Sequence, residues 1–118
     1  MTGRFVAREK SRAFALRVVK SCQYLQSEKQ EYVLSKQLLR SGTAIGALVR
    51  EAEYAESRAD FVHKMHVALK EANETDYWID LLAASGYFHP DSGKSLQADC
   101  RQLLRILIAI IKTTKSRR

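Results

Sequence analysis

The sequence predicts an all-α protein: a single domain, residues 1–118, folded as an up-down antiparallel four-helix bundle. Apolar residues recur at alternating intervals of four and three in four successive segments, which places them on one face of an α-helix and not on a strand. Residues 7–85 contain no proline and only two glycines, so little interrupts these segments. The length suits one hydrophobic core.

The first helix is expected at about residues 7–26 and the second at about residues 31–55, with polar residues 27–30 between them. The first has a weak apolar face that consists of Phe14 or Ala15, Val18, Cys22 and Leu25. The second has a stronger one that consists of Leu34, Leu38, Ser41, Ile45, Leu48, Ala52 and Ala55. Gly42 and Gly46 lie beside that face. Either a helix of this chain or of a second subunit approaches them closely, or the pair is a tolerated flaw.

The third helix is expected at about residues 58–85 and the fourth at about residues 95–115. Ser57 and Asp60 form a variant of the capping box, with one long kinked helix as the alternative to separate second and third helices. Gly86 is a natural stop, and residues 87–93 are the clearest loop. The apolar faces consist of Phe61, Met65, Ala68, Ala72, Thr75, Ile79 and Leu82, and of Leu96, Cys100, Leu103, Leu107, Ile110 and Thr114.

The fourth helix has a second apolar row beside its core face, formed by Leu104, Ile108 and Ile111. A wide core would bury this row within the chain. A homo-oligomer interface would bury it against another copy, since soluble monomers rarely expose contiguous apolar surface. The sequence therefore predicts self-association, with a wide core as the alternative.

Positive charge is concentrated in the terminal helices. The net charge is +7, and residues 1–30 and 91–118 each carry +5, whereas residues 31–90 carry −3. The first and last helices are neighbours in an up-down bundle, so their basic residues are expected to merge on one side. Such a surface predicts RNA or DNA binding, with a merely solvated surface as the alternative. Its residues are Arg8, Arg12, Arg101, Arg105, Lys112 and Lys115.

A hairpin of the second and third helices that folds about residue 57 brings Arg40 level with Glu74 and near Glu71. We therefore predict an ion pair of Arg40 with one of these glutamates. Such a pair fixes the register between two helices more than it adds stability.

No catalytic or metal-binding set is expected. Asp60 and His63 resemble half of a di-iron motif, but neither terminal helix offers an inward carboxylate, so His63 and His66 are expected at the surface. Cys22 and Cys100 are expected in the core as free thiols, close enough to touch across the first and fourth helices. We expect no enzyme and no cofactor. The longest apolar run, residues 106–111, is too short to span a membrane, so a cytoplasmic protein without membrane contact is expected.

Two segments, residues 32–47 and 57–78, resemble a known family, the four-helix-bundle proteins encoded in intervening sequences of bacterial 23S ribosomal RNA genes. The similarity extends over nearly the whole chain. Its main motifs are Gln37–Ser41, Ser57–Phe61, Lys64-Met65, Ala68–Ala72, Glu74-Thr75 and Tyr77-Trp78. The family's usual serine and asparagine are replaced by Ala44 and Leu48, so a polar role at those positions is not carried over.

The resemblance implies a left-handed bundle that assembles as a homopentamer and has no established enzymatic activity. Distant relatives resemble the accessory proteins of diversity-generating retroelements, which are basic pentamers that bind nucleic acid and a reverse transcriptase. The sequence thus favours a non-enzymatic oligomeric bundle that binds RNA or DNA as an accessory protein. The alternative is a protein–protein interaction scaffold without direct nucleic-acid contact, with a reverse transcriptase or another protein as its partner.

Overall fold

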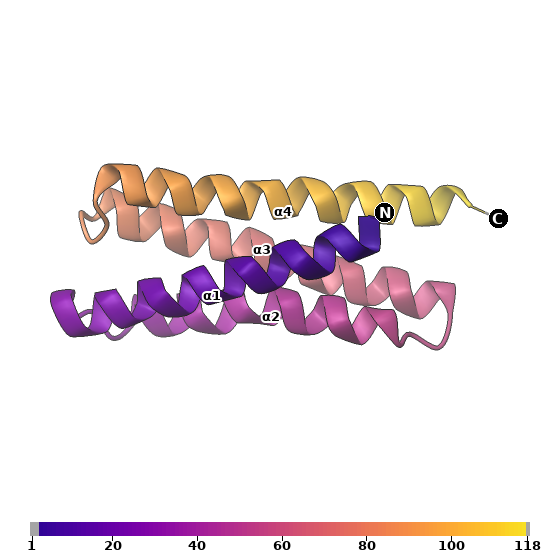
Figure 1. The fold of residues 1–118 in the computed structure, drawn as a ribbon, viewed down its shortest axis with the longest axis horizontal. Coiled ribbons are helices and arrows are strands. Elements are labelled where there is room, and N and C mark those ends of the chain that lie inside the picture. Colours follow the sequence, from indigo (N-terminus) through magenta and orange to yellow (C-terminus); the bar gives the residue numbers. More distant parts are fainter. Residues whose placement is uncertain (1–2, 118) are drawn as a thin grey trace.

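A computed structural model describes residues 3–117, and every regular element in that part of the chain is an α-helix. The helices run along the long axis of the molecule (Figure 1). They are α1 (Gly3–Lys29), α2 (Leu34–Glu53), α3 (Arg58–Ala84) and α4 (Pro90–Ser116). The prediction of an all-α chain with four helices is confirmed, and α2 and α3 are separate helices.

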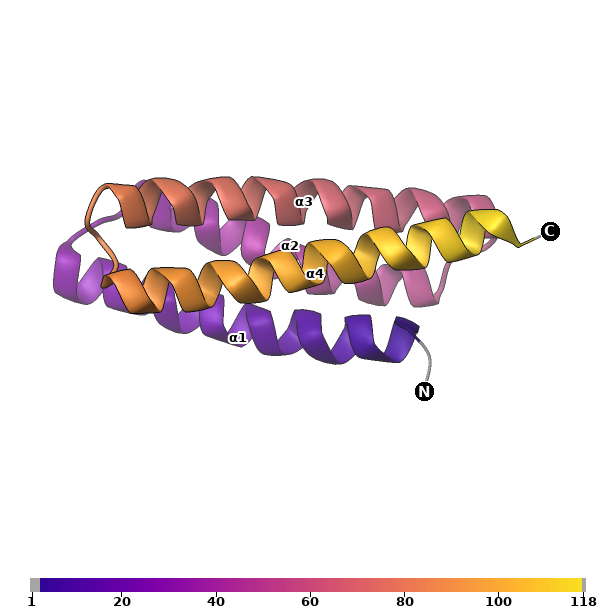
Figure 2. The same ribbon diagram turned by 90° about the horizontal axis from the view of Figure 1, so that it is seen from above.

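Each helix packs against two neighbours in a ring: α1 and α3 each lie beside α2 and α4, and the backbones of the diagonal pairs stay farther apart. The chain reverses direction at each connection, so the two ends of the chain lie at the same end of the molecule (Figures 1 and 2). The molecule is elongated and measures 50 × 22 × 21 Å. The ring order places the α1–α2 groove on the side opposite the α3–α4 groove.

The core consists of the apolar faces that the sequence predicts. All seven predicted positions of α3 and all six of α4 are buried. Leu38, Met65 and Leu107 are each no more than 1% exposed. The spacing of three and four keeps such residues on one side of each helix, and the ring of four helices encloses that side.

The buried face of α2 is rotated from its predicted position. Leu34 and Leu48 are half-buried, and Ser35 and Val49 are buried instead. Gly42 is also buried, and a Cβ atom there would lie 2.8 Å from Cγ2 of Val18 in α1. Only glycine therefore allows α1 to pack this closely without a shift. The close neighbour of Gly42 is a helix of the same chain, one of the alternatives that the sequence left open.

The connection between α3 and α4 is shorter than predicted. Gly86 has the left-handed backbone expected of a helix stop, with φ of +83°. However, α4 begins at Pro90, so the prediction of a loop through residue 93 is wrong. Proline at a first helical position forfeits no hydrogen bond, since that N–H has no partner within the helix. His89 completes the start, because its Nδ1 accepts the N–H of Asp91 at 3.3 Å.

A buried glutamate starts α2, and sequence reasoning did not single it out. Glu31 is 8% exposed, and its Oε1 accepts the N–H of Ser35 at 2.7 Å. Its Oε2 accepts the N–H groups of Leu34 at 3.0 Å and Val33 at 3.3 Å. One carboxylate thus satisfies three backbone donors that a helix start leaves open. Burial raises the pKa of Glu31, but these hydrogen bonds outweigh burial and hold the pKa below its usual value.

No helix among residues 3–117 combines the length and the apolar character that crossing a lipid bilayer would require.

Candidate nucleic-acid interface

Four basic residues follow one exposed face of α4, and we call this set the α4 basic face: Lys94, Arg101, Arg105 and Lys112. They extend over about 27 Å at 1.5 Å per residue. Arg101 Nε lies 3.3 Å from Oδ1 of Asp76 in α3. No carboxylate of residues 3–117 forms an ion pair with the other three, or with Lys115 beyond them. Most of this charge therefore faces solvent uncompensated.

Arg8 and Arg12, the two residues of α1 in the predicted basic surface, lie on the side of that helix that faces α2. Arg8 Nε is 3.7 Å from Oε1 of Glu53 at the end of α2. Arg12 and Arg50 line the same hollow of about 270 Å³ between the two helices. The α4 basic face instead borders α3. The prediction that the two basic surfaces merge on one side is therefore wrong. Arg8 and Arg12 face α2, whereas Arg101 faces α3.

Positive charge converges instead at the end of the bundle where the chain begins and ends. Arg4, Arg58 and Arg117 line a pocket of about 270 Å³ there, together with Glu53 and Phe61. We call it the terminal arginine pocket. The guanidinium carbon of Arg4 is 4.1 Å from the Phe61 ring centroid, and Arg58 donates to the carbonyl oxygen of Arg117. Sequence reasoning missed Arg58 because it belongs to the segment whose net charge is negative.

The groove between α2 and α3 contains a compact set of charged and aromatic groups. Arg40 donates to Glu71 at 3.2 Å and also to Glu74. The indole N–H of Trp78 donates to Glu74 Oε2 at 2.9 Å. This bond and Arg40 hold the pKa of Glu74 below its usual value despite partial burial. These are the two pairings that the hairpin register predicts, and with both carboxylates engaged this set offers little to an external ligand.

The three residues of the second apolar row of α4 differ in how far they are buried. Ile108 is 40% exposed, and Leu104 is half-buried against the core. Ile111, by contrast, is only 5% exposed and belongs to the core of its own chain. The surface that a second copy could cover is therefore reduced to Leu104 and Ile108. The alternative of a wide core, in which the chain itself buries this row, is therefore correct for Ile111 alone.

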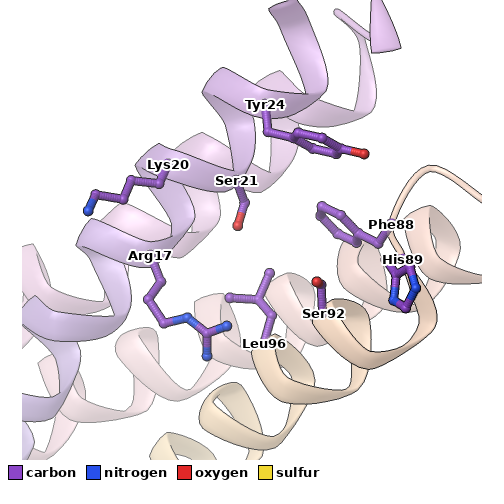
Figure 3. A pocket seen from close by; sticks show the side chains of 8 residues that line it. All are labelled: Arg17, Lys20, Ser21, Tyr24, Phe88, His89, Ser92 and Leu96. Carbon is purple, nitrogen blue, oxygen red and sulfur yellow. The ribbon is translucent and has the colours of Figure 1, made fainter. Parts of the chain in front are cut away.

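A pocket with a volume of about 470 Å³ lies between α1 and α4, near the connection of α3 with α4 (Figure 3). We call it the seam pocket. Its lining combines aromatic, hydroxyl and basic side chains: Arg17, Lys20, Ser21, Tyr24, Phe88, His89, Ser92 and Leu96. Sequence reasoning missed this site because its residues come from opposite ends of the chain and share no motif.

Among residues 3–117, no group of three or more histidine, cysteine or acidic side chains is arranged to hold a metal ion. His63 is exposed and His66 is half-buried. Cys22 and Cys100 are buried free thiols that donate to different helices, to the carbonyl oxygens of Ser35 and Ala72, both at 3.3 Å. Burial raises the pKa of Cys22 to about 11 and the pKa of Cys100 to about 12, so neither is a ready nucleophile.

Comparison with known proteins identifies relatives of the chain. The family model described as 23S rRNA-intervening sequence protein matches residues 4–109. The chain is also similar to a crystal structure from Bacteroides thetaiotaomicron, described as a protein with unknown function from the S23 ribosomal protein family. The TM-score is 0.92 at 48% sequence identity, over 94% of this chain and 99% of the other. A search of curated proteins gave no match.

Proposed function

The chain belongs to the 23S rRNA-intervening sequence protein family, and from that premise we propose that it is a non-enzymatic, oligomeric bundle that binds RNA or DNA as an accessory protein. The ligand chemistry common to both nucleic acids is the phosphate backbone. The observation that carries the proposal is the α4 basic face, three of whose four cations have no carboxylate partner among the described residues. Uncompensated cations in a row are the electrostatic footprint of phosphate binding.

The terminal arginine pocket supports the same proposal. It presents three guanidinium groups against the single carboxylate of Glu53. Arginine is suited to phosphate because its planar fork donates two parallel hydrogen bonds. Lys112 and Lys115 extend the positive surface from this pocket along α4, so one nucleic-acid strand could follow both.

Self-association is part of the proposal. Ile108 is 40% exposed beside the half-buried Leu104, and a second copy that covers it would pack along the edge of the α4 basic face, next to Arg105 and Lys112. The family resemblance favours five copies and a left-handed bundle. An oligomer would repeat the basic surface and raise the overall affinity for one long nucleic acid. A molar mass of one chain by light scattering would contradict this part.

The test is a fluorescence anisotropy titration with a structured RNA and a DNA of the same sequence at two salt concentrations. We expect affinity to fall steeply with salt, because binding releases counterions from the phosphates. Replacing Arg105 and Lys112 by glutamine should weaken binding and reduce the salt slope by about two. Lys36→Gln, on an exposed part of α2 remote from this face, is the matched control and should change little. Absence of binding at low salt would overturn the proposal, and salt-independent affinity would overturn its phosphate mechanism.

The exposed apolar row also favours a second candidate function, a protein–protein interaction scaffold without nucleic-acid contact. Its partner, a reverse transcriptase by the family resemblance, would cover Leu104 and Ile108. Affinity for such a partner that persists at high salt, together with no affinity for RNA or DNA, would distinguish this function from the first.

A further inference from the structure

The seam pocket lies far from the terminal arginine pocket, and of the α4 basic face only Lys94 belongs to the same turns of α4. The seam pocket is formed by the second half of α1, the end of the α3–α4 connection and the first turns of α4, in the half of the bundle opposite the terminal arginine pocket (Figures 1 and 3). Its volume of about 470 Å³ lies within the range of small-molecule sites. It can therefore admit one small ligand, but not a duplex.

The apolar part of the pocket suits a flat ring. Phe88 and Leu96 are 8% and 2% exposed, so they form a firm apolar floor. Tyr24 is 40% exposed and extends from α1 over the space beside Phe88 (Figure 3). Nucleic-acid bases stack on aromatic side chains of this kind irrespective of sequence.

The polar part of the pocket has unused hydrogen-bonding groups. Ser21 of α1 and Ser92 of α4 direct their hydroxyls toward the pocket, and neither makes a hydrogen bond within residues 3–117 (Figure 3). Elsewhere, the hydroxyls of Ser27 and Thr43 donate to carbonyl oxygens of their own helix. Because a hydroxyl both donates and accepts, these two serines can pair with the polar edge of any base.

The two cations of the pocket differ in availability. Arg17 is held by Asp99 Oδ2 at 2.6 Å and by the carbonyl oxygen of Ser95 at 3.3 Å. It therefore forms a fixed side of the pocket. Lys20 is exposed and has no ion pair within the described residues; its side chain extends away from Tyr24 and Phe88 in Figure 3, so its ammonium must turn back toward the pocket to meet an anion there.

From this arrangement we propose that the seam pocket binds one nucleoside monophosphate, with the base on Tyr24 above Phe88 and Leu96 and the phosphate at Lys20. The site deepens the proposed function and rests on it, since the nucleotide in question is an unpaired one of a bound RNA. A free nucleotide offers the same base and phosphate as an unpaired nucleotide of RNA. The two arms of the experiment distinguish these two ligands.

The first arm compares two RNA duplexes that differ only in a single bulged adenosine, by fluorescence anisotropy. We expect the protein to bind the bulged duplex about tenfold more tightly, which is the size of one base stacked on an aromatic ring. Tyr24→Ala should abolish this preference and leave the affinity for the perfect duplex unchanged, whereas Tyr24→Phe should retain it. Tyr54→Ala is the matched control, because Tyr54 is 90% exposed at the other end of the bundle. Circular dichroism verifies that each variant is folded.

The second arm titrates AMP and adenosine into the protein alone, monitored by NMR chemical shifts. Lys20→Gln should weaken AMP binding severalfold and leave adenosine binding unchanged. Equal affinity for both duplexes, or a preference that survives in Tyr24→Ala, would overturn the pocket proposal while phosphate-backbone binding stands. Binding of AMP without any RNA binding would support the pocket for a free nucleotide and overturn the proposed function. If neither RNA nor AMP binds, both the pocket proposal and the proposed function are overturned.

Discussion

The contact between α2 and α3 and the contact between α1 and α4 lie on opposite sides of the same ring of helices, but different chemistry closes them. Between α2 and α3, Thr75 Oγ1 lies 2.9 Å from Ser41 Oγ in a fully buried position. At the surface of the same contact, Arg40 forms ion pairs with Glu71 and Glu74. Between α1 and α4, the described polar bonds all come from Arg17, and the seam pocket lies beside them.

The two contacts therefore differ in how many polar groups they leave without a partner in the chain. In the α2–α3 contact, the hydrogen-bond donors and acceptors pair with each other across the two helices, so few remain to bind a ligand. In the α1–α4 contact, the hydroxyls of Ser21 and Ser92 and the ammonium of Lys20 remain unpaired within the described chain. Unpaired polar groups around an apolar floor are the usual features of a binding site.

The largest expected effect that tests this comparison is on the buried hydroxyl pair. Thr75 Oγ1 is also 2.7 Å from the carbonyl oxygen of Glu71. A hydroxyl has one proton, so Thr75 donates to one of these oxygens and can accept from Ser41. Thr75→Val should lower the free energy of unfolding by about 1–2 kcal/mol, measured by urea denaturation. Ser21→Ala in the seam pocket is the control and should change it by less than about 0.5 kcal/mol. Equal effects would contradict the comparison.

A smaller effect is expected at the start of α2, next to the last turn of α1. Glu31→Gln should lower the free energy of unfolding at neutral pH by about 1 kcal/mol, as for loss of a helix cap. The pKa of Glu31 is lowered in the folded state, so its contribution is present above the pKa of the unfolded chain and disappears as pH falls through the folded value. The difference between the wild type and Glu31→Gln should therefore shrink in acid. A constant difference from neutral to acidic pH would show that the charge is not responsible.

The smallest effects concern the exposed ion pairs of the two contacts. Asp99→Asn removes the partner of Arg17, and both side chains are more than a third exposed. Its effect on the free energy of unfolding should stay within about 0.5 kcal/mol. Glu74→Gln should cost more, because Glu74 also accepts from Trp78. Urea denaturation of both variants in low and high salt provides the measurement, and a larger loss in Asp99→Asn would reverse the expected order.

Local rules predicted those parts of the fold that depend on neighbours in sequence. The periodicity of Leu38, Met65 and Leu107 placed them in the core, and Ser57 starts α3 by accepting the N–H of Asp60 at 3.0 Å. The start of α4 was missed because Pro90 is as compatible with a first helical turn as with a loop. Glu31 was missed because its bonds to the backbone form only once the chain turns between α1 and α2.

The candidate sites were less predictable, for a geometric reason. The number of basic residues in α1 and α4 was evident, but the side on which Arg8 or Arg101 lies depends on how far each helix rotates against its neighbours. Residues 17 and 99 are far apart in the chain, and so are residues 24 and 88. No spacing in the sequence connects them.

The sequence by itself determined that four helices form, most of the residues they bury, and that the chain is strongly basic, because helix periodicity, caps and charge are properties of short segments. Only the tertiary structure decided that Arg8 and Arg12 face α2 whereas Arg101 faces α3, and that Arg4, Arg58 and Arg117 meet at one end. It also decided that Ile111 is buried and that a pocket opens between α1 and α4. Those outcomes depend on packing across the bundle, such as the close approach of Val18 to Gly42 that brings α1 and α2 together.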